Sequence, residues 1–393
     1  MKILVANLGS TSFKYRLFDM DAASERMLAK GGYERVDDHG VAIADALEKL
    51  VADGHLSSPD DLDGVGFKTV LGKDLSGCVP ADEKALAALD GLAAIAPAHN
   101  PAYAKGIRQF SKLTKARLVA LFETSFYQWV PEPAKRYAVP PSWHAAGIRR
   151  YGFHGASHKF IAERSAALLD RRDIVERVQQ LYVKGPGPEP ERKPPLRVVS
   201  CHLGGSSSVT GILNGVAIGS SMGLSPQSGL PQNNRVGDLD AMAIPLAMKE
   251  LGLTLEEAVQ ALSKEGGLLG LSEVSNDLRD IDQAAENGDS KAQLAIDHLI
   301  HSIRHYIGAY AFAMGGLDAI VFTAGIGENQ GSLRKAVCEG LESFGIIIDD
   351  TANAQKYSGE AFLQAEGSDV NILVIPTNEE LVVARETWRQ LQK

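Results

Sequence analysis

Residues 4–15 read LVANLGSTSFKY, an apolar run that leads into a small, hydroxyl-rich turn and then into a second run. We expect a strand, a tight turn and a returning strand. Gly9 lets the backbone approach a ligand closely, and Ser10 and Ser12 offer hydroxyls beside backbone N–H groups. Lys14 adds a cation. These features are typical of a turn that binds a phosphate group.

A second turn of the same kind lies far downstream. Residues 198–210 read VVSCHLGGSSSVT, which repeats the order of apolar strand, Leu-Gly, small hydroxyl residues and further strand. Two related turns in one chain favour duplicated α/β halves that face each other across a nucleotide cleft.

The length of 393 residues exceeds what one hydrophobic core usually serves, so two domains are expected. Apolar residues make up 45% of the chain and aromatic residues only 6%, as in α/β proteins with many tight turns. We expect an N-terminal domain of residues 1–147, completed by a closing helix at about 379–393. The second domain would span residues 148–378 and carry a proline- and glycine-rich surface insertion at 184–195.

Charge and cysteine content exclude several classes of protein. The formal charge of -9 argues against general binding of nucleic acid, because a protein that binds a polyanion needs a concentrated basic surface. Cys78, Cys201 and Cys338 are isolated and odd in number, so neither a disulfide framework nor a thiolate metal site is indicated. We expect no signal peptide and no membrane span, because the sequence starts with a predicted strand and has no basic segment followed by a long apolar run. A cytoplasmic protein without membrane contact is therefore expected.

Periodicity predicts the elements that carry candidate residues. The strand over 117–122 would deliver Glu123 to its carboxyl end, where open parallel sheets place ligands. The glycines after residue 323 are not a dinucleotide fingerprint, because Gln330 occupies the third glycine position, and the chain has no Walker-type loop. Helices are predicted over 43–51, 157–170, 255–262 and 294–314 and from about 332, and further strands over 64–72 and 318–323.

Eight ordered blocks resemble the acetate kinase family of short-chain acyl kinases, within the actin-like, sugar-kinase-like ATPase superfamily. They are NLGSTSFK at 7–14, PAHNP at 97–101, RRYGFHGASH at 149–158, CHLG at 201–204, SMGLSP at 221–226, RVGDLD at 235–240, FTAGIGEN at 322–329 and PTNEE at 376–380. The resemblance covers nearly the whole chain. It implies a two-domain, duplicated actin-like (ribonuclease H-like) α/β fold with a central cleft between the domains.

The resemblance also implies an activity. It is reversible transfer of the ATP γ-phosphoryl group to a short-chain carboxylate, which gives ADP and an acyl phosphate by direct in-line transfer, with Mg²⁺ bridging the phosphates. Catalysis of this kind is mostly alignment and stabilisation of charge on the transferring oxygens. The family further implies a homodimer that associates through the second domain.

Site residues follow from the matched blocks. Arg235 would hold the carboxylate or the transferring group through its planar fork, and His154 would donate to its oxygens. His99 and His202 match positions along the phosphate path, although each is as readily a buried packing histidine on residue chemistry alone. Asn7 and Glu379 fit as sparse Mg²⁺ ligands. Glu379 also suits the first turn of a helix.

The nucleotide would lie between the two turns and the glycine-rich segment beyond residue 323. Its phosphates are assigned to Ser10, Ser12, Lys14, His202, Gly204 and Gly205. Its adenosine is assigned to Gly325, Gly327 and Asn329 together with Asp277, Leu278 and Arg279. The family usually has an aromatic residue where Leu278 stands, and leucine can still cover an adenine face.

Three departures from the family pattern touch the catalytic end. Lys68 replaces an arginine, Glu123 replaces an aspartate and Gly205 replaces an asparagine, and lysine keeps the charge but loses the bidentate geometry. The pocket for the acyl chain is assigned to Val70, Ala98, Phe153 and Pro226. Ala98 stands where leucine is common, and a methylene is worth roughly 1–3 kcal/mol of discrimination, so propionate or a longer acid competes with acetate.

Three other functions stay open on the sequence. The same fold can use pyrophosphate or another donor, although the 325–329 block argues for ATP. A sugar or polyol kinase would need a general-base aspartate. A non-catalytic nucleotide sensor is conceivable because of Lys68 and Gly205.

Overall fold

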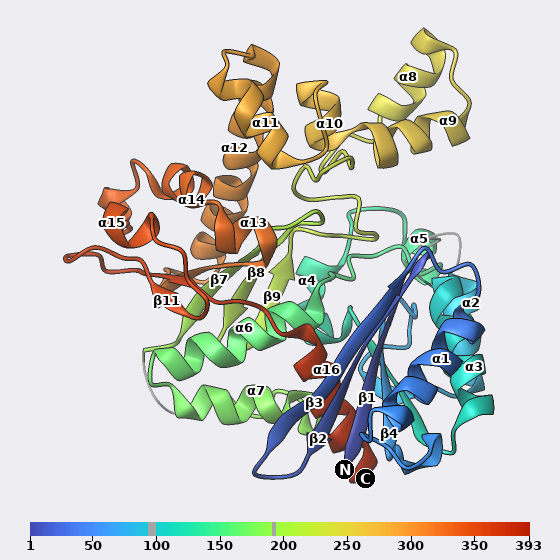
Figure 1. The fold of residues 1–393 in the computed structure, drawn as a ribbon. Coiled ribbons are helices and arrows are strands. Elements are labelled where there is room, and N and C mark those ends of the chain that lie inside the picture. The colour runs from blue at the N-terminus through green and yellow to red at the C-terminus, as the bar shows by residue number, and fades with distance from the viewer. Residues whose placement is uncertain (93–99, 191–193) are drawn as a thin grey trace.

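The computed structural model describes residues 1–92, 100–190 and 194–393. Within them the strands form two six-stranded sheets, with the orders β3-β2-β1-β4-β6-β5 and β11-β12-β10-β7-β8-β9. When the second order is read in reverse, from β9 to β11, each of its strands has the same rank within its sheet as the matching strand of the first order. The predicted duplication and the two-domain α/β fold are therefore confirmed. Figure 1 shows the two sheets in separate lobes, with the blue N-terminal strands in one and the strands after residue 197 in the other.

The first sheet grows from the hairpin that the sequence predicts. Its strands are β1 (Lys2–Leu8), β2 (Ser12–Met20), β3 (Glu25–Glu34), β4 (Gly64–Thr69), β5 (Cys78–Pro80) and β6 (Arg117–Phe122). β4 lies parallel to β1, and β6 lies parallel to β4. The carboxyl ends of these three strands therefore meet at one edge of the sheet.

Alternation along β1 sends its side chains to two faces of the sheet. Leu4 and Leu8 pack in the core formed with α1 (His39–Ala52) and α3 (Asn100–Leu113). Ile3 and Val5 pack in another core with residues of α16 (Glu379–Leu391). The predicted closing helix therefore returns to the first sheet and contacts β1, β4 and β6.

The second sheet repeats this arrangement. Its strands are β7 (Arg197–His202), β8 (Ser208–Leu213), β9 (Val216–Ser220), β10 (Ala319–Thr323), β11 (Ala361–Phe362) and β12 (Asn371–Val374). One face packs on α6 (Gly155–Leu168) and α7 (Arg172–Lys184), and the other on the long α12 (Ser290–Ala313). The same core that holds Ile3 and Val5 includes Ile161 and Val198, so it continues from one lobe into the other.

The other described elements connect or extend the lobes. They are η1 (Pro59–Asp61), α2 (Glu83–Gly91), η2 (Ser125–Tyr127), α4 (Glu132–Lys135), α5 (Pro141–Ala145), α8 (Ala243–Leu251), α9 (Leu255–Gln260), the π-helix η3 (Ala261–Glu265), α10 (Gly267–Ser272), α11 (Leu278–Glu286), α13 (Ala324–Asn329), α14 (Gly331–Cys338), η4 (Glu342–Phe344) and α15 (Asp350–Asn353). η2 and α4, which a division at residue 147 assigns to the first domain, contact β9 of the second sheet.

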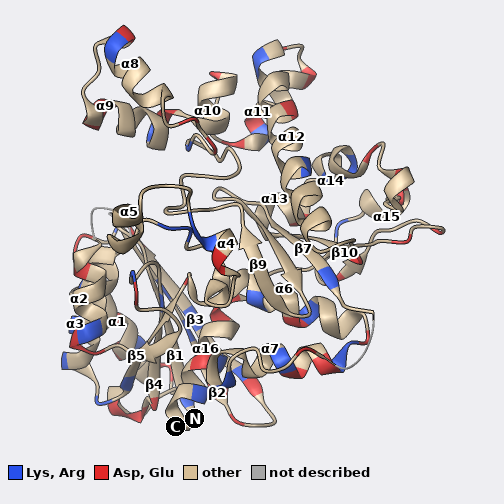
Figure 2. Cartoon of the chain, turned by 180° about the vertical axis from the view of Figure 1, so that it is seen from behind, with Lys and Arg blue, Asp and Glu red and all other residues tan. Residues whose placement is uncertain are grey.

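The structure also bears on the surface expectations. In the insertion, the described residues after α7 form no helix or strand up to Pro190, and Glu189 is bound by Arg177. Lys and Arg positions are interspersed with Asp and Glu positions along both lobes (Figure 2). All three cysteines are buried and free. Within the described ranges, no helix has the length and apolar character that crossing a bilayer would require.

Candidate active site

A buried ion triplet lies at the carboxyl edge of the first sheet. Lys68 near the end of β4 forms an ion pair with Glu379, the first residue of α16. Its Nζ atom also lies 3.3 Å from Oε1 of Glu123, which directly follows β6. Parallel pairing of β4 with β6 aligns Lys68 with Leu121 and so brings Glu123 to the same edge. The sheet and the returning helix thus bring together three charged residues that are 55 or more positions apart in the sequence.

The two carboxylates of this triplet are not equivalent. Burial raises the pKa of Glu123 to about 7, which the charge of Lys68 offsets only in part. Burial acts in the same direction on Glu379 and is the largest single cause, but the charge of Lys68, its hydrogen bond and the neighbouring His202 together outweigh it and lower the pKa of that carboxyl. Burial opposes the charge of Lys68, yet attraction to Glu379 and Glu123 raises its pKa well above the usual value. Glu379 is therefore the ionised partner at neutral pH.

Oxygen donors for a hard cation converge at the same edge. Asn7 follows Ala6, which pairs with Phe67 beside Lys68, and the Oδ1 atom of Asn7 accepts from the Tyr103 hydroxyl at 2.9 Å. Both carboxylate oxygens of Glu123 are buried without a hydrogen-bond partner. In the part of the chain that the structure describes, no three His, Cys, Asp or Glu side chains form a ready metal cage. A few oxygens without a cage suit Mg²⁺, which keeps most of its waters and binds phosphates.

His154 sits next to this edge in a constrained backbone conformation. It caps α6 with φ 59° and ψ 32°, in the left-handed region that residues other than glycine rarely adopt. The next residue, Gly155, donates its N–H to the carbonyl of Glu123 at 2.9 Å. A Cβ on Gly155 would lie 2.2 Å from that same oxygen. Glycine is therefore required there, and the start of α6 is tied to the end of β6.

A hydrogen-bonded series of histidine and serine side chains orients the His154 ring through its Nδ1 atom. Nδ1 of His154 and Nε2 of His158 each lie 2.8 Å from the Ser208 hydroxyl, and Nδ1 of His158 lies 2.8 Å from that of Ser200. His158 and the two serines were missed in the sequence. The spacing of His154 and His158 by one helical turn, and the pairing of Ser208 with His202 across β7 and β8, are the signals that could have found them.

His202 lies directly beside His154. Their rings stack with centroids 4.1 Å apart, and Nδ1 of His202 contacts the Ser157 hydroxyl at 2.8 Å. Burial lowers the pKa of His202 to about 4, and burial together with the neighbouring His202 and His158 lowers the pKa of His154 far below its usual value. Both imidazoles are therefore neutral at pH 7. The described contacts engage Nδ1 in each, which leaves Nε2 for a ligand.

Arg235 provides a half-buried cation on the second lobe. Its Nη1 donates to the Ser206 hydroxyl and to Oε1 of Gln232, each at 3.3 Å. No carboxylate pairs with it among the described residues, and burial lowers the pKa of its guanidinium. Asp238 in the same loop instead accepts from the backbone N–H of Gly229 and from the hydroxyl of Tyr306 on α12. The guanidinium is thus available for an anion.

The second turn lies against the glycine-rich segment, as their assignment to one nucleotide requires. The carbonyl of Leu203 accepts from the backbone N–H groups of Ile326 and Gly327 at 2.8 and 3.0 Å. Gly204 and Gly205 follow this contact directly, and Asn329 donates to the carbonyl of Gly325. His202 at the end of β7 pairs in register with Thr323 at the end of β10. Backbone hydrogen bonds therefore join the predicted phosphate turn to α13.

The structure differs from the expectation for Leu278. Its side chain is 3% exposed and packs in the core with Ile281 and Leu299, because α11 buries its apolar face against α12. It presents no face to an adenine ring. Arg279 is exposed and forms a bidentate pair with Asp277, which caps α11.

The first turn also differs in detail. The N–H of Gly9 donates to the carbonyl of Ser12 at 2.9 Å, so it closes the hairpin. Lys14 pairs with Glu34 of β3 at 2.9 Å on an exposed face. It nevertheless shares a cavity of about 440 Å³ with Asn7, so it lies within reach of the carboxyl edge of the sheet.

The residues assigned to the acyl chain are brought together in part. Val70 and Phe153 belong to one small apolar cluster with Leu71, Tyr151 and Met222, which joins the loop after β4 to the segments before α6 and after β9. The carbonyl of Pro226 accepts from Gln232, which contacts Arg235. Ala98 and His99 lie outside the described residues.

Comparison with known proteins agrees with this geometry. The model of the acetokinase family matches residues 2–180 and 189–385. The chain is 40% identical to an acetate kinase of Macrococcus caseolyticus, with 98% of each protein covered, and 38% identical to one of Geobacillus kaustophilus, with 99% and 98% covered.

Solved structures give the same result. An acetate kinase of Porphyromonas gingivalis superposes with a TM-score of 0.86 at 33% identity over 100% of both chains. A propionate kinase of Francisella tularensis subsp. tularensis SCHU S4 superposes with a TM-score of 0.84 at 31% identity over 99% of both. This chain belongs to the acetokinase family.

Proposed function

We propose that the protein is a carboxylate kinase that reversibly transfers the γ-phosphoryl group of ATP to a short-chain carboxylate, giving an acyl phosphate and ADP. The observation that carries the proposal is the junction of β6 with α6. There the hydrogen bond from Gly155 to Glu123 holds the neutral His154 beside the Lys68 ion triplet. Family membership supports the same reaction.

The chemistry asks for positive and hydrogen-bonding groups around a transferring phosphoryl. The charge of such a transition state is spread over the phosphoryl oxygens, so preorganised donors stabilise it. Arg235 binds the anionic acceptor or the phosphoryl group, because its guanidinium has no carboxylate partner in the described part of the chain. Transfer runs directly from donor to acceptor, without a phosphoenzyme on Glu123 or Glu379.

His154 donates from Nε2 to the same oxygens. This requires its Nδ1 to accept from Ser208. His158 must then donate to Ser208 and accept from Ser200, and the three 2.8 Å contacts allow this direction. Neutral His202, stacked on His154, lines the phosphate path in the same way.

Mg²⁺ would be held by Asn7 and Glu379, with waters completing its coordination, and it would neutralise charge on the phosphates of ATP. Glu123 adds two oxygens that have no hydrogen-bond partner at the same edge. Lys68 balances both carboxylates and keeps the region near neutrality when the phosphates are absent.

The nucleotide lies over the second turn and α13. Gly204, Gly205, Gly325, Gly327 and Asn329 form its floor, and the hydroxyls of Ser10 and Ser12 reach its phosphates from the first lobe. Asp277 and Arg279 border the adenosine side, whereas Leu278 contributes only to the core.

The preferred acid is acetate or a slightly longer homologue. Val70 and Phe153 supply an apolar wall, and one relative of similar structure is named a propionate kinase. Purified protein with Mg²⁺, ATP and acetate, propionate or butyrate should form an acyl phosphate that hydroxylamine traps. A strong preference for acetate would refute the proposal that a longer acid is the substrate. The absence of product with every acid would refute the kinase function itself.

The second candidate is a nucleotide sensor of the same fold. One observation favours it, because Lys68 already occupies the carboxylate of Glu379 that would otherwise face a metal. Under this alternative the protein binds ATP, as measured by calorimetry, but forms no acyl phosphate in the same assay.

The protein is further proposed to be a cytoplasmic homodimer that associates through the second lobe. Large apolar side chains are exposed there on α8, α9 and α12, and Phe312 is 92% exposed. Sedimentation of the intact protein should give twice the mass of one chain, and Phe312→Glu should lower it to one chain.

A further inference from the structure

Two helices begin in the candidate site and pack against each other below it. α6 starts with His154 as its cap, and α16 starts with Glu379. α16 contacts both α6 and the central strands of the first sheet. Figure 1 shows α16 between the blue strands and the green helices α6 and α7. Any change in the angle between these helices therefore moves the two site residues relative to each other.

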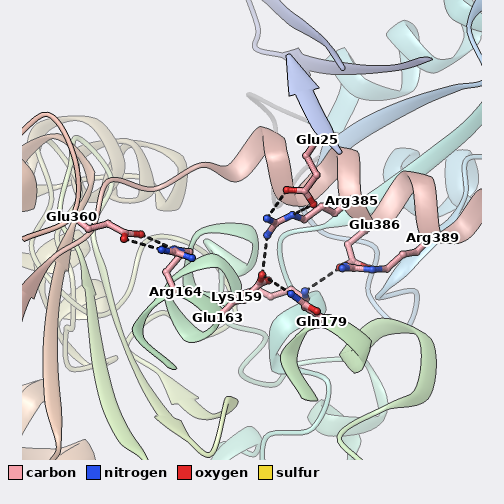
Figure 3. A network of polar contacts seen from close by, with 9 residues as sticks. All are labelled: Glu25, Lys159, Glu163, Arg164, Gln179, Glu360, Arg385, Glu386 and Arg389. Carbon is pink, nitrogen blue, oxygen red and sulfur yellow. Dashed lines mark hydrogen bonds and ion pairs between the residues drawn. The ribbon is translucent and has the colours of Figure 1, made fainter. Parts of the chain in front are cut away.

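A buried ion pair joins the helices beyond the site. Nζ of Lys159 on α6 lies 3.0 Å from Oε1 of Glu386 on α16, and the two side chains are 2% and 1% exposed. Arg389 donates to the same carboxylate at 2.6 Å (Figure 3). The ammonium of Lys159 also lies 5.2 Å from the ring centre of Tyr182 on α7.

A second pair crosses the same junction. Nη1 of Arg385 on α16 lies 3.1 Å from Oε1 of Glu163 on α6, and Gln179 of α7 donates to that oxygen at 3.0 Å. The other side of the Arg385 guanidinium forms a bidentate contact with Glu25 of β3, at 2.6 and 2.7 Å. Arg385 thus ties the edge of the first sheet to a helix of the second lobe (Figure 3).

Charges this deeply buried are costly, and apolar side chains of similar size would often be at least as stable. What an ion pair adds is a defined geometry, because its charge-assisted hydrogen bonds are satisfied in few arrangements. The surroundings of Lys159 and Glu386 are otherwise apolar core, so a small rotation of one helix leaves the pair poorly aligned.

The distance along each helix from the ion pair to the site residue determines how far that residue moves when the angle between α6 and α16 changes. Lys159 lies five residues after His154 and Glu386 seven after Glu379, which is about 7 and 10 Å of helix. A rotation of about 10° at the junction moves the site residues by roughly 1–2 Å. A misplacement of about 1 Å can cost on the order of 100-fold in rate.

We propose that the Lys159–Glu386 pair, supported by Arg385–Glu163, fixes the angle between α6 and α16 and thereby positions His154 against Glu379. These four side chains are positioning residues and touch no substrate. The proposal rests on the proposed kinase function for its kinetic readout. It predicts that stability and turnover respond differently when the charges are removed one at a time or together.

The test compares Lys159→Met, Glu386→Leu and the double variant. Glu386→Leu leaves the buried ammonium of Lys159 without its carboxylate, and Lys159→Met leaves the buried Glu386 with Arg389 as its remaining cation. Each single variant should lower the melting temperature, Glu386→Leu by at least about 5 °C. The double variant should return to within about 2 °C of the wild type, whereas its kcat stays at least about 10-fold lower. KM for ATP and for the acid should change by less than about threefold, because no substrate contact is lost.

The matched control is the ion pair of Arg164, on the same helix α6, with Glu360, which lies outside α16 (Figure 3). Arg164→Met with Glu360→Met should change kcat by less than about twofold. The proposal is overturned if the double Lys159/Glu386 variant regains kcat together with its melting temperature, since the pair would then serve stability alone.

Small-angle X-ray scattering supplies a readout that does not depend on turnover. If the wild type forms no acyl phosphate, the proposed function fails. The positioning role then stands only if the double variant has a measurably different radius of gyration from the wild type, because the lobes are no longer held at one angle. Identical scattering in that case overturns it.

Discussion

Replacing Glu123 by glutamine should remove a pH dependence of stability that this single carboxyl imposes. Burial raises its pKa from 4.5 to about 7. The folded protein therefore binds this proton more tightly than the unfolded chain does. The stabilising contribution is fully present below about pH 4.5 and is lost as the pH rises through 7. A difference of this size corresponds to roughly 3 kcal/mol at about 1.4 kcal/mol per pKa unit.

The structure explains why burial dominates at this carboxyl. The side chain is 6% exposed, and neither oxygen has a hydrogen-bond partner. Lys68 lies 3.3 Å away, but its ammonium is shared with Glu379. One shared cation does not compensate for the lost hydration, so Glu123 retains its proton up to near-neutral pH.

Urea unfolding at pH 5 and pH 8 in chelator-containing buffer measures the effect. Between these pH values the wild type should lose about 2–3 kcal/mol more unfolding free energy than Glu123→Gln does. The compared quantity is the difference in unfolding free energy between the two pH values, so any pH-independent destabilisation by the buried amide of the variant cancels. Glu48→Gln on the exposed face of α1 is the control and should follow the wild type. Parallel pH profiles for wild type and Glu123→Gln would refute the reasoning.

Three further substitutions test the site. Ser208→Ala removes the buried hydroxyl between His154 and His158, so kcat should fall about 10-fold in the hydroxylamine assay, and the two unpartnered ring nitrogens should lower the unfolding free energy by about 1–3 kcal/mol. An unaltered kcat would show that the serine does not orient His154. Gly155→Ala places a Cβ 2.2 Å from a backbone oxygen, and urea unfolding should show a loss of about 3 kcal/mol or more. Arg235→Lys keeps the charge without the fork, so kcat should fall by at least about 100-fold while urea unfolding stays within about 1 kcal/mol of wild type. Near-normal turnover of that variant would place the anion elsewhere.

Local sequence predicted the central strands of both sheets and several of the helices. The strand over 117–122 coincides with β6, because an uninterrupted apolar run between polar residues has a short and definite length. The helix predicted over 294–314 begins earlier, at Ser290, because Asp289 caps it and accepts from two backbone N–H groups before the apolar period starts. The segment predicted over 255–262 leaves the α-helix at Gln260 and continues as a π-helix, which periodicity does not distinguish.

The candidate site was predictable only where a residue ends a strand or lies in a matched block. Glu123 was expected at the carboxyl edge of the sheet, and it lies there. Leu278 was expected beside the nucleotide, but helix packing turns it into the core. His158, Ser200 and Ser208 were missed because their contacts cross between α6 and the second sheet. The spacing of His154 and His158 by one helical turn marks two histidines on one helix face, but it does not say which serines they meet.

The amino-acid sequence by itself determined the two hydroxyl-rich hairpins, their repetition and the order of strands and helices, because turn chemistry and apolar periodicity act over a few neighbouring residues. The tertiary structure alone decided which charges meet. Lys68 is shared between two carboxylates, and Lys159 is buried against Glu386, because burial and approach are properties of packed elements. These pairs join residues between 55 and more than 300 positions apart, so their energies exist only once the sheets and the returning helix are assembled.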